Sequence, residues 1–408
     1  MIPDLRIEDY TYELPDERIA KYPLQERDSS KLLVYGRDCG SHGVEEDIFR
    51  NLPGYLSENS IMVFNDTKVV PARLFFRRES GAHIEIFCLE PVEPAEYAGA
   101  FAAVGKCSWH CVIGNSKRWK DDILHYDTSS PELLAIKLQA KLLERDGQTG
   151  TVEFSWDSDL PFSAVLDTLG RIPIPPYLRR ETESIDLERY QTTYARIRGS
   201  VAAPTAGLHF TPETLREISG RNIETERVCL HVGAGTFLPV KTSRVAEHPM
   251  HREPYVVSKA LIEKLAQGEK PVTAVGTTSV RTLESLYYAG ISCIRDGHPS
   301  DTGQWDPYTL EGKLRDISTG EALGALADYL ERNDLDSLET GTRIIIVPGF
   351  KFRIVDAMVT NFHQPQSTLL LLISAFVSGD WKTIYDYALS HGFRFLSYGD
   401  SSLLFRRD

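Results

Sequence analysis

The chain has 408 residues, of which 42% are hydrophobic and 25% are charged, and this ordinary globular composition allows one large core and a second, smaller one. Its formal net charge of −13 argues against a protein that binds nucleic acid without sequence preference through its overall positive charge, because such proteins usually carry a basic surplus. A local basic face would still allow contact with RNA phosphates.

The first part of the chain predicts one buried strand and then a change of pattern. Ile61–Phe64 is apolar on both faces, which suits a strand buried between layers of helices. Within residues 69–160, polar and apolar residues alternate, as at His83–Leu89 and Leu134–Leu143, and a Gly/Asp turn leads into a strand at Thr151–Trp156. Period-two strands joined by such turns predict antiparallel β structure, a small barrel or sandwich.

Beyond residue 160, apolar runs and helical patterns alternate. Further buried strands are predicted at Val228–Val232, Val272–Val275, Ile344–Val347 and Ala357–Val359. Helices are predicted at Thr211–Ser219, Lys259–Gln267, Val280–Ala289 and Leu369–Val377. This alternation is typical of an α/β domain with substantially parallel strands. Residues 296–341 are rich in Gly, Asp and Pro, with one helical pattern at Glu321–Arg332, so we expect a surface excursion there.

These patterns predict an α/β main domain, residues 1–68 and 161–408, interrupted by an antiparallel β insert, residues 69–160. The six cysteines are scattered and include no C-x-x-C pair, which favours buried thiols in a reducing cytoplasm over a zinc site. The N-terminus does not have the pattern of a signal peptide. The longest apolar run, Thr368 to Val377, is too short to span a bilayer. We therefore expect a soluble, cytoplasmic protein that holds no metal.

Polar loops follow four of the predicted buried strands. They are Asn65-Asp66-Thr67-Lys68, His231-Val232-Gly233-Ala234-Gly235-Thr236, Gly276-Thr277-Thr278-Ser279 and Asn361-Phe362-His363. Ligand sites of α/β folds lie at the carboxyl ends of strands, where loops converge and helix N-termini point inward. The four loops therefore predict one shared pocket.

Two of these loops also have a purely structural explanation. Residues 276–279 could serve only to cap the helix that begins near Val280, and Gly233 and Gly235 could serve only a tight turn. The glycine pattern does not predict a dinucleotide fold, because the chain continues extended through Val240, with a proline, where a helix should begin. This argues against a Rossmann NAD enzyme and against a methyltransferase-type cofactor loop.

Three histidines, His209, His231 and His363, lie in loops where the pocket is expected. His209 follows a shaped Pro-Thr-Ala-Gly loop, residues 204–207, and precedes a helix start at residues 211–212. A single histidine is more often structural than catalytic. Three histidines in one predicted pocket make a role in acid–base catalysis about as well supported as a structural role.

Basic residues cluster locally in spite of the acidic total, and aromatic rings accompany them. The clusters contain Arg171, Arg179, Arg180, Arg189, Arg196 and Arg198 near Tyr190 and Tyr194, then Lys117, Arg118 and Lys120 around Trp119, and Arg73, Arg77 and Arg78 near the start of the insert. Arginine beside aromatic rings suits phosphate contact and base stacking on RNA. A solvated charged face is the plainer explanation of any single cluster.

A series of stretches in fixed order is recognisable. They are Tyr22-Pro23-Leu24 with Arg27-Asp28, Phe64 to Leu74, Ile172 to Tyr177, Tyr190 to Ala195, Ala202 to Thr211, His231 to Phe237, Val275 to Ser285, Val355 to Leu370, and Phe395 to Asp400. With these stretches the chain resembles, over nearly its whole length, the S-adenosylmethionine:tRNA ribosyltransferase-isomerase family. So many long, ordered matches are specific.

The resemblance implies a barrel-like α/β domain with an inserted antiparallel β-barrel, and a monomer. It implies that the ribosyl part of S-adenosylmethionine moves to 7-aminomethyl-7-deazaguanine at the wobble position of tRNA and rearranges to give epoxyqueuosine, while adenine and methionine leave. S-adenosylmethionine and tRNA are then substrates, and no metal, separate cofactor or membrane is implied.

For this reaction, acid–base work is expected from His209, His231 or His363, or from Asp66 if burial makes it basic enough. The residues expected to contact substrate are Asn65, Thr67, Lys68, Thr205, Gly207, Phe210, Gly233, Gly235, Thr236, Phe237, Thr277, Thr278, Ser279, Arg281, Asn361 and Phe362. The aromatic rings among them could face the sulfonium, and Arg281 or the helix start at Ser279 could hold the methionine carboxylate. The residues expected to contact RNA are Arg73, Lys117, Arg118, Lys120, Arg171, Arg179, Arg180, Tyr190 and Tyr194.

Two other functions compete with this one. The first is another S-adenosylmethionine-dependent RNA-modifying enzyme, such as a methyltransferase, which would release S-adenosylhomocysteine. The second is a tRNA-binding protein without catalysis, which would leave the polar loops at the strand ends without a purpose.

Overall fold

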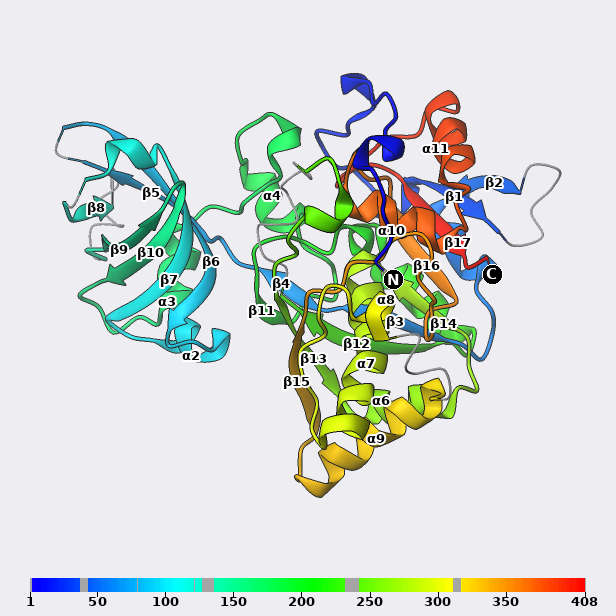
Figure 1. Ribbon diagram of the computed structural model, residues 1–408. Helices are drawn as coiled ribbons and strands as arrows, with labels where there is room; N and C mark the ends of the chain where they lie inside the picture. The colour runs from blue at the N-terminus through cyan, green and yellow to red at the C-terminus, as the bar shows by residue number, and fades with distance from the viewer. Residues whose placement is uncertain are drawn as a thin grey trace.

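The computed structural model of the chain describes residues 2–36, 43–78, 80–120, 122–126, 136–231, 242–310 and 317–407. The main domain is built on a mixed sheet (Figure 1). Its described strands are, in spatial order, β15 (Ser337–Thr342), β13 (Glu253–Ser258), β12 (Glu224–Leu230), β3 (Ile61–Asn65), β14 (Val272–Val275), β16 (Ala357–Asn361), β17 (Ser401–Phe405), β1 (Lys31–Tyr35) and β2 (Val44–Ile48). The row β12–β3–β14–β16 is parallel, as is the pair β17–β1, and the other pairs are antiparallel. Where the resemblance implies a barrel-like form, the described strands make an open sheet with β15 and β2 at its ends.

Strand β3 shows why the sheet is covered on both faces. All five of its residues are buried, and successive side chains of a strand point to opposite faces. Ile61 and Val63 join one hydrophobic core, whereas Met62 and Phe64 join another. Each face therefore needs its own layer of helices.

The helices supply these two layers (Figure 1). The core around Val63 includes apolar residues of α6 (Lys259–Gln267), α7 (Thr277–Asp296), α9 (Thr319–Arg332), α10 (Thr368–Phe376) and α11 (Trp381–Ser390). The core around Phe64 includes residues of α1 (Leu52–Tyr55) and α5 (Pro212–Gly220). Two short helices, α4 (Ser184–Arg189) and α8 (Asp306–Leu310), lie in connecting segments. Among the described helices, none has the length and apolarity that a membrane crossing needs.

The insert is a closed antiparallel barrel, which stands beside the main domain (Figure 1). Its strands are β5 (Arg73–Arg77), β6 (His83–Glu93), β7 (Lys106–Gly114), β8 (Leu124–Tyr126), β9 (Gln139–Asp146) and β10 (Thr149–Ser155). Alternate side chains, such as Ile84 and Ile86 of β6, fill its interior together with apolar residues of α2 (Tyr97–Ala102) and α3 (Phe162–Leu169). The predicted fold class, an α/β domain with an inserted β-barrel, is confirmed.

A small two-stranded sheet lies next to the point where the chain leaves the main domain for the insert. Strand β4 (Thr67–Val69) pairs in parallel with β11 (Ile197–Ser200). Beside this sheet, Tyr97 of the insert stacks on His231, with ring centroids 4.7 Å apart. Gly199 (φ +151°) makes room for the contact, because a Cβ there would lie 2.4 Å from the His231 ring. The barrel is therefore fastened to the end of β12.

Two expectations differ from the structure in the second half of the main domain. Residues 296–341, expected at the surface, contribute to the core: Leu323, Leu326 and Leu330 of α9 are buried against α6 and α7, and β15 extends the sheet. The strand predicted at Ile344–Val347 is wrong. Those residues are buried, but the Ile345 and Val347 amides bond to Gln304 and Tyr308, so the α8 segment takes the place of a neighbouring strand.

The packing of α9 leads to a stability prediction. Replacing Leu326 with Ala should lower the free energy of unfolding by about 2–5 kcal/mol, because it removes apolar contacts and leaves a cavity in the core. Urea unfolding followed by circular dichroism measures the change. The matched control is Leu335→Ala, at an exposed leucine just after the same helix, which should change stability by less than about 0.5 kcal/mol. Equal effects of the two substitutions would contradict the core position of α9.

Candidate functional site

A cavity of the described chain lies at the carboxyl ends of β14 and β16. Its volume is about 350 Å³. The wall is formed by the start of α7, by the segment that follows β16, and by the loops that contain residues 202–206, 248–253 and 344–346. Loops that are far apart in sequence therefore share one cavity, at the edge of the sheet where α/β folds bind ligands.

The predicted site residues fall into three groups. Those that line the cavity are Thr205, Thr277, Thr278, Arg281, Asn361, Phe362 and His363. Those that the structure places elsewhere are Asn65, Asp66, Thr67, Lys68, Gly207, His209, Phe210, His231 and Ser279. Gly233, Gly235, Thr236 and Phe237 lie outside the described residues.

The start of α7 forms one wall of the cavity. Gly276 precedes the helix with φ +88°, a value that favours glycine, and its N–H donates to Val359 O at 2.8 Å. The Ser279 hydroxyl donates to Val275 O at 2.7 Å and is fully buried, so it closes the strand–helix turn. Thr278 Oγ1 is buried without a hydrogen-bond partner among the described residues. Since the first N–H groups of a helix have no partner within the helix, this wall favours an anion.

Arg281 and Glu253 form an ion pair in the same wall. Arg281 Nη1 donates to Glu253 Oε2, and Arg281 Nε donates to Ile344 O at 3.2 Å. Within the described part of the chain, Arg281 Nη2 is buried and has no partner. The guanidinium therefore keeps a donor that a ligand can use.

Asn361 links the cavity to His209. Asn361 Nδ2 donates to Leu396 O at 3.1 Å and lies 3.2 Å from His209 Nε2. Because a carbonyl only accepts, the amide nitrogen must face Leu396, and His209 Nε2 must then be the unprotonated nitrogen. His209 Nδ1 lies 2.8 Å from Ser30 Oγ and donates to it. His209 is thus a neutral imidazole whose contact with the cavity passes through Asn361.

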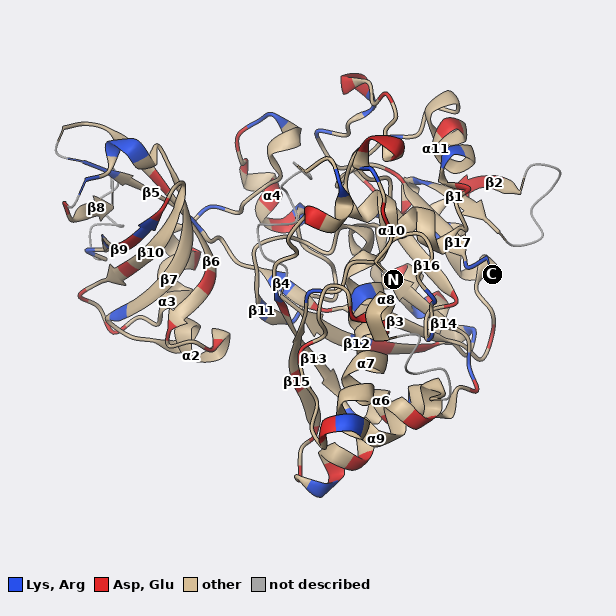
Figure 2. Cartoon of the chain, in the orientation of Figure 1, with Lys and Arg blue, Asp and Glu red and all other residues tan. Residues whose placement is uncertain are grey.

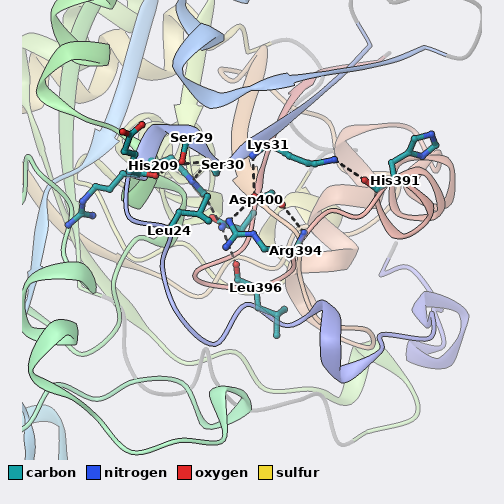
Figure 3. Close-up of polar contacts among 12 residues, drawn as sticks. Leu24, Ser29, Ser30, Lys31, His209, His391, Arg394, Leu396 and Asp400 are labelled. Carbon is teal, nitrogen blue, oxygen red and sulfur yellow. Dashed lines mark hydrogen bonds and ion pairs between the residues drawn. The ribbon is translucent and has the colours of Figure 1, made fainter.

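The loop that carries Leu396 is held in place by Asp400 (Figure 3). The buried Asp400 carboxylate accepts the backbone N–H groups of Lys31 and Arg394, at 3.1 and 2.8 Å, and the Arg394 Nη2 group, also at 2.8 Å. Leu396 itself has φ +69°. These bonds fix the Leu396 carbonyl, and through it the orientation of the Asn361 amide. Asn361 Oδ1 is left buried with no partner among the described residues.

His363 follows β16 directly and lines the cavity. Its Nε2 lies 2.9 Å from Thr360 Oγ1, and the Thr360 hydroxyl donates to Asn361 O at 3.4 Å. The Thr360 oxygen therefore accepts a hydrogen bond from the Nε2–H group, which leaves Nδ1 as the unprotonated, basic nitrogen. The Tyr12 hydroxyl donates to His363 O, and the His363 N–H donates to Tyr385 Oη at 3.0 Å. The backbone of His363 is thereby held at both its polar atoms.

Asp66 and His231 lie behind the cavity, at the ends of β3 and β12. Asn65 ties these strands together, because its side chain donates to Leu230 O and accepts from Leu230 N, both at 3.1 Å. Thr67 Oγ1 lies 3.4 Å from His231 Nδ1. Burial raises the pKa of Asp66, and Arg227, 4.0 Å away, opposes the rise. The packing of the strands and of the barrel accounts for Asn65, Thr67 and His231, whereas Asp66 Oδ1 is buried without a partner among the described residues.

Gly207 and Phe210 also have packing roles. A Cβ on Gly207 would lie 2.0 Å from the Tyr194 hydroxyl, so only glycine leaves room for that ring. Phe210 is fully buried and meets Phe49 and Phe64 edge to face, at centroid distances of 4.9 and 5.1 Å. Neither of these residues faces the cavity.

Comparison with known proteins identifies the family. The sequence model of a family described as queuosine biosynthesis protein matches residues 7–404. The chain is 39% identical over 404 residues to the S-adenosylmethionine:tRNA ribosyltransferase-isomerase of Trichlorobacter lovleyi, with 98% of this chain and 99% of that protein covered. The chain belongs to this family. The ribosyltransferase-isomerase of Francisella tularensis subsp. novicida is 35% identical over 406 residues, with 98% of this chain and 100% of that protein covered. The match to a crystal structure of S-adenosylmethionine tRNA ribosyltransferase from Thermotoga maritima covers 97% of this chain and 99% of the Thermotoga chain, with 27% identity and a TM-score of 0.46.

The residues predicted to contact RNA in this ribosyltransferase-isomerase chain differ in exposure. Lys117, Arg118 and Lys120 are exposed on the barrel, and Figure 2 shows a basic helical turn there, next to β5. Arg171 is exposed and lies over the Phe75 ring, 4.9 Å from its centroid.

The other RNA candidates are either paired with an acidic side chain or buried, and Tyr190 lines the cavity. Arg73 pairs with Glu85, and Arg179 pairs with Asp16 at 2.9 Å. Arg180 makes two bonds to Asp186, at 2.7 and 2.8 Å. The rings of Tyr190 and Tyr194 are buried. The exposed basic groups of the barrel are therefore the best placed for RNA.

The parts of the cavity wall that were not predicted from the sequence include the polar segment His248-Pro249-Met250-His251 with Glu253. These residues precede or begin β13, an antiparallel strand, so they do not follow a buried parallel strand, which was the signal used to find the other loops. The signal that could have found them is two histidines and a glutamate within six residues. Within the described residues, no group of three or more His, Cys, Asp or Glu side chains is placed to hold a metal ion.

Burial lowers the pKa of His209, His231 and His363 from 6.5 to about 4. All three imidazoles are therefore neutral at neutral pH, and their pKa values lie well below that of an ordinary histidine. Between pH 6.5 and pH 4, the unfolded chain takes up protons that the folded protein does not bind. These histidines consequently leave the fold at full stability above pH 6.5 and destabilise it progressively as the pH falls towards 4.

This linkage predicts the effect of replacing His209. In His209→Gln, the unfolding free energy should depend less steeply on pH between 5 and 6, by up to about 1.4 kcal/mol per pH unit, since one proton fewer is taken up on unfolding. Urea unfolding at several pH values measures this slope. His298→Gln, at an exposed ring, is the control and should keep the wild-type slope. An unchanged slope in His209→Gln would mean that His209 is not held neutral by burial.

Proposed function

We propose that the chain transfers the ribosyl moiety of S-adenosylmethionine to 7-aminomethyl-7-deazaguanine at the wobble position of tRNA and isomerises it. The product is epoxyqueuosine in the RNA, and adenine and methionine are released. S-adenosylmethionine is a substrate in this reaction, and the proposal requires no metal or further cofactor.

One observation carries this proposal beyond family membership. Four residues of a single cavity, Tyr190, Thr278, Arg281 and Asn361, each hold a buried polar atom without a partner in the described structure. Buried polar groups are normally satisfied, and each one left unpaired costs about 1–3 kcal/mol. A polar ligand in the cavity would satisfy such atoms. The cavity of about 350 Å³ lies within the range of about 300–1,000 Å³ that small-molecule sites occupy.

His363 is the proposed acid–base group, because among the four candidates it is the one that lines the cavity. The first step removes a proton from the carbon beside the sulfonium, which the positive sulfur acidifies. Nδ1 of the neutral imidazole can accept that proton. Since burial lowers the pKa of His363 to about 4, its imidazolium is a stronger acid than that of an exposed histidine. It then returns its proton readily to the departing adenine.

The ends of S-adenosylmethionine have distinct proposed positions. The methionine carboxylate lies between Arg281 Nη2 and the first N–H groups of α7. The ring of Phe362, at the end of β16, lies beside the sulfonium and attracts it by cation–π interaction. Asn361 Oδ1 accepts a hydrogen bond from the nucleoside.

The tRNA has to present its wobble base out of the stack for its aminomethyl nitrogen to reach the ribose in the cavity. Lys117, Arg118 and Lys120 of the barrel would hold the phosphates of the anticodon stem-loop. The five cysteines that the structure describes are buried free thiols, which suits a reducing cytoplasm. We place the enzyme there as a monomer.

An assay of products tests this function against its rivals. Protein, S-adenosylmethionine and a precursor-bearing anticodon stem-loop are incubated, and the RNA and the small molecules are analysed by mass spectrometry. The expected outcome is RNA that has gained the rearranged ribosyl group, with equal amounts of free adenine and methionine. Release of S-adenosylhomocysteine would show a methyltransferase, and unchanged S-adenosylmethionine with tightly bound RNA would show a non-catalytic binder.

Replacing His363 tests its role. His363→Gln should slow adenine release by about 100-fold or more, since general acid–base catalysis contributes about 10²–10⁴-fold. Binding of S-adenosylmethionine, measured by isothermal titration, should stay within a few-fold of wild type. His298→Gln serves as the control and should release adenine at the wild-type rate. Near wild-type turnover in His363→Gln would remove this histidine from the mechanism.

A further inference from the structure

Two buried groups of opposite charge stand side by side in the cavity wall. Glu253, the first residue of β13, is 6% exposed, and Arg281, in the second turn of α7, is 7% exposed. Both line the cavity and are paired with each other. The cavity therefore offers a cationic and an anionic group next to each other.

Neither group uses all its hydrogen-bonding capacity inside the protein. Arg281 Nε donates to Ile344 O and Arg281 Nη1 donates to Glu253 Oε2, whereas Nη2 has no partner in the described structure. Glu253 holds Arg281 with Oε2, whereas a carboxylate has about four acceptor positions on its two oxygens. An additional donor and an additional acceptor can therefore be engaged at this pair.

Stability alone does not explain the pair. Taking two charges out of water costs several kcal/mol per ion, and apolar residues of similar volume are often as stabilising or better. An unpaired guanidinium N–H adds to that cost. A ligand that pairs with both groups would offset it, which favours a binding role.

The start of α7 strengthens the anionic subsite. Thr277 and Thr278 precede Arg281 by four and three residues, so the three side chains share one face of the helix, and all of them line the cavity. The helix has 20 residues, and its positive end favours a carboxylate beside the Arg281 guanidinium. His248 and His251 line the cavity as well. Burial and the neighbouring His251 lower the pKa of His248.

We infer that Glu253 binds the α-ammonium group of the amino-acid end of S-adenosylmethionine, while Arg281 and the start of α7 bind its α-carboxylate. This inference rests on the proposed function and adds a specificity-determining residue to it. The pair recognises the zwitterion as a whole, so an adenosine sulfonium that lacks the amino group loses a charged contact. The methionine end then lies against β13 and α7, and the nucleoside end points towards Asn361 and His363.

The test compares two ligands on matched proteins. The ligands are S-adenosylmethionine and its desamino analogue, which keeps the sulfonium and the carboxylate. Wild-type protein should bind S-adenosylmethionine about 10- to 150-fold more tightly, the range expected for one charge-assisted hydrogen bond. In Glu253→Gln this preference should fall to within about threefold of unity, because the charged acceptor is lost. Isothermal titration gives the dissociation constants, and adenine release gives the matching kcat/KM ratios.

The control variant is Glu339→Gln, at an exposed glutamate of the neighbouring strand β15, and it should keep the wild-type preference. If Glu253→Gln weakens both ligands equally and keeps the preference, Glu253 only positions Arg281 and the inference is overturned. The inference is also overturned if the variant binds both ligands normally but loses activity on the RNA substrate. That outcome would indicate that Glu253 contacts the aminomethyl group of the base.

Two further measurements keep the inference separate from the folding of the variant and from the proposed function. Wild-type protein that binds both ligands equally tightly would overturn the inference even if Glu253→Gln did not fold. Wild-type protein that neither binds S-adenosylmethionine nor releases adenine would instead overturn the proposed function. A reciprocal comparison uses S-adenosylmethionine and its decarboxylated analogue. Arg281→Gln should lose the wild-type preference for S-adenosylmethionine over this analogue, and Glu253→Gln should retain it.

Discussion

The hydrogen bond from Gly276 N to Val359 O, 2.8 Å long, is the contact on which the cavity depends most directly. It extends the parallel pairing of β14 and β16 by one step beyond β14. The start of α7 and the segment Asn361–His363 consequently emerge at the same edge of the sheet. Parallel strands that are buried on both faces offer no other place for polar side chains than their ends. The apolar core thus dictates where the chemistry is done.

Burial shapes the groups around the cavity in two ways. It keeps three imidazoles neutral, with pKa values of about 4. It also leaves polar atoms of Thr278, Arg281 and Asn361 without hydrogen-bond partners among the described residues. The Asn361 amide is oriented from behind by His209 and Leu396, and Asp400 fixes the loop that carries Leu396. A site preorganised in this manner spends little free energy on reorganisation when its ligand arrives.

Polar loops at the ends of buried strands identified the cavity correctly at α7 and after β16. Thr277, Thr278, Arg281, Asn361, Phe362 and His363 all line it. The same signal also selected Asn65 and Thr67, which connect neighbouring strands. It missed Glu253 and the two histidines before it, because an antiparallel strand brings its amino end, not its carboxyl end, to this edge. Strand direction, which a single sequence does not reveal, separates these cases.

The sequence by itself determined the fold class, the inserted barrel, the family, the parallel strands β12, β3, β14 and β16, and the helices α5, α6, α7, α9 and α10, since periodicity and ordered motifs are local properties of the chain. It did not determine that α9 and β15 belong to the core, because a Gly- and Asp-rich segment can still bury one apolar face of a helix. Only the tertiary structure decided which histidine faces the cavity, that His209 acts through Asn361, and that Arg281 meets Glu253. Those facts depend on the register between segments far apart in sequence, which long-range packing sets.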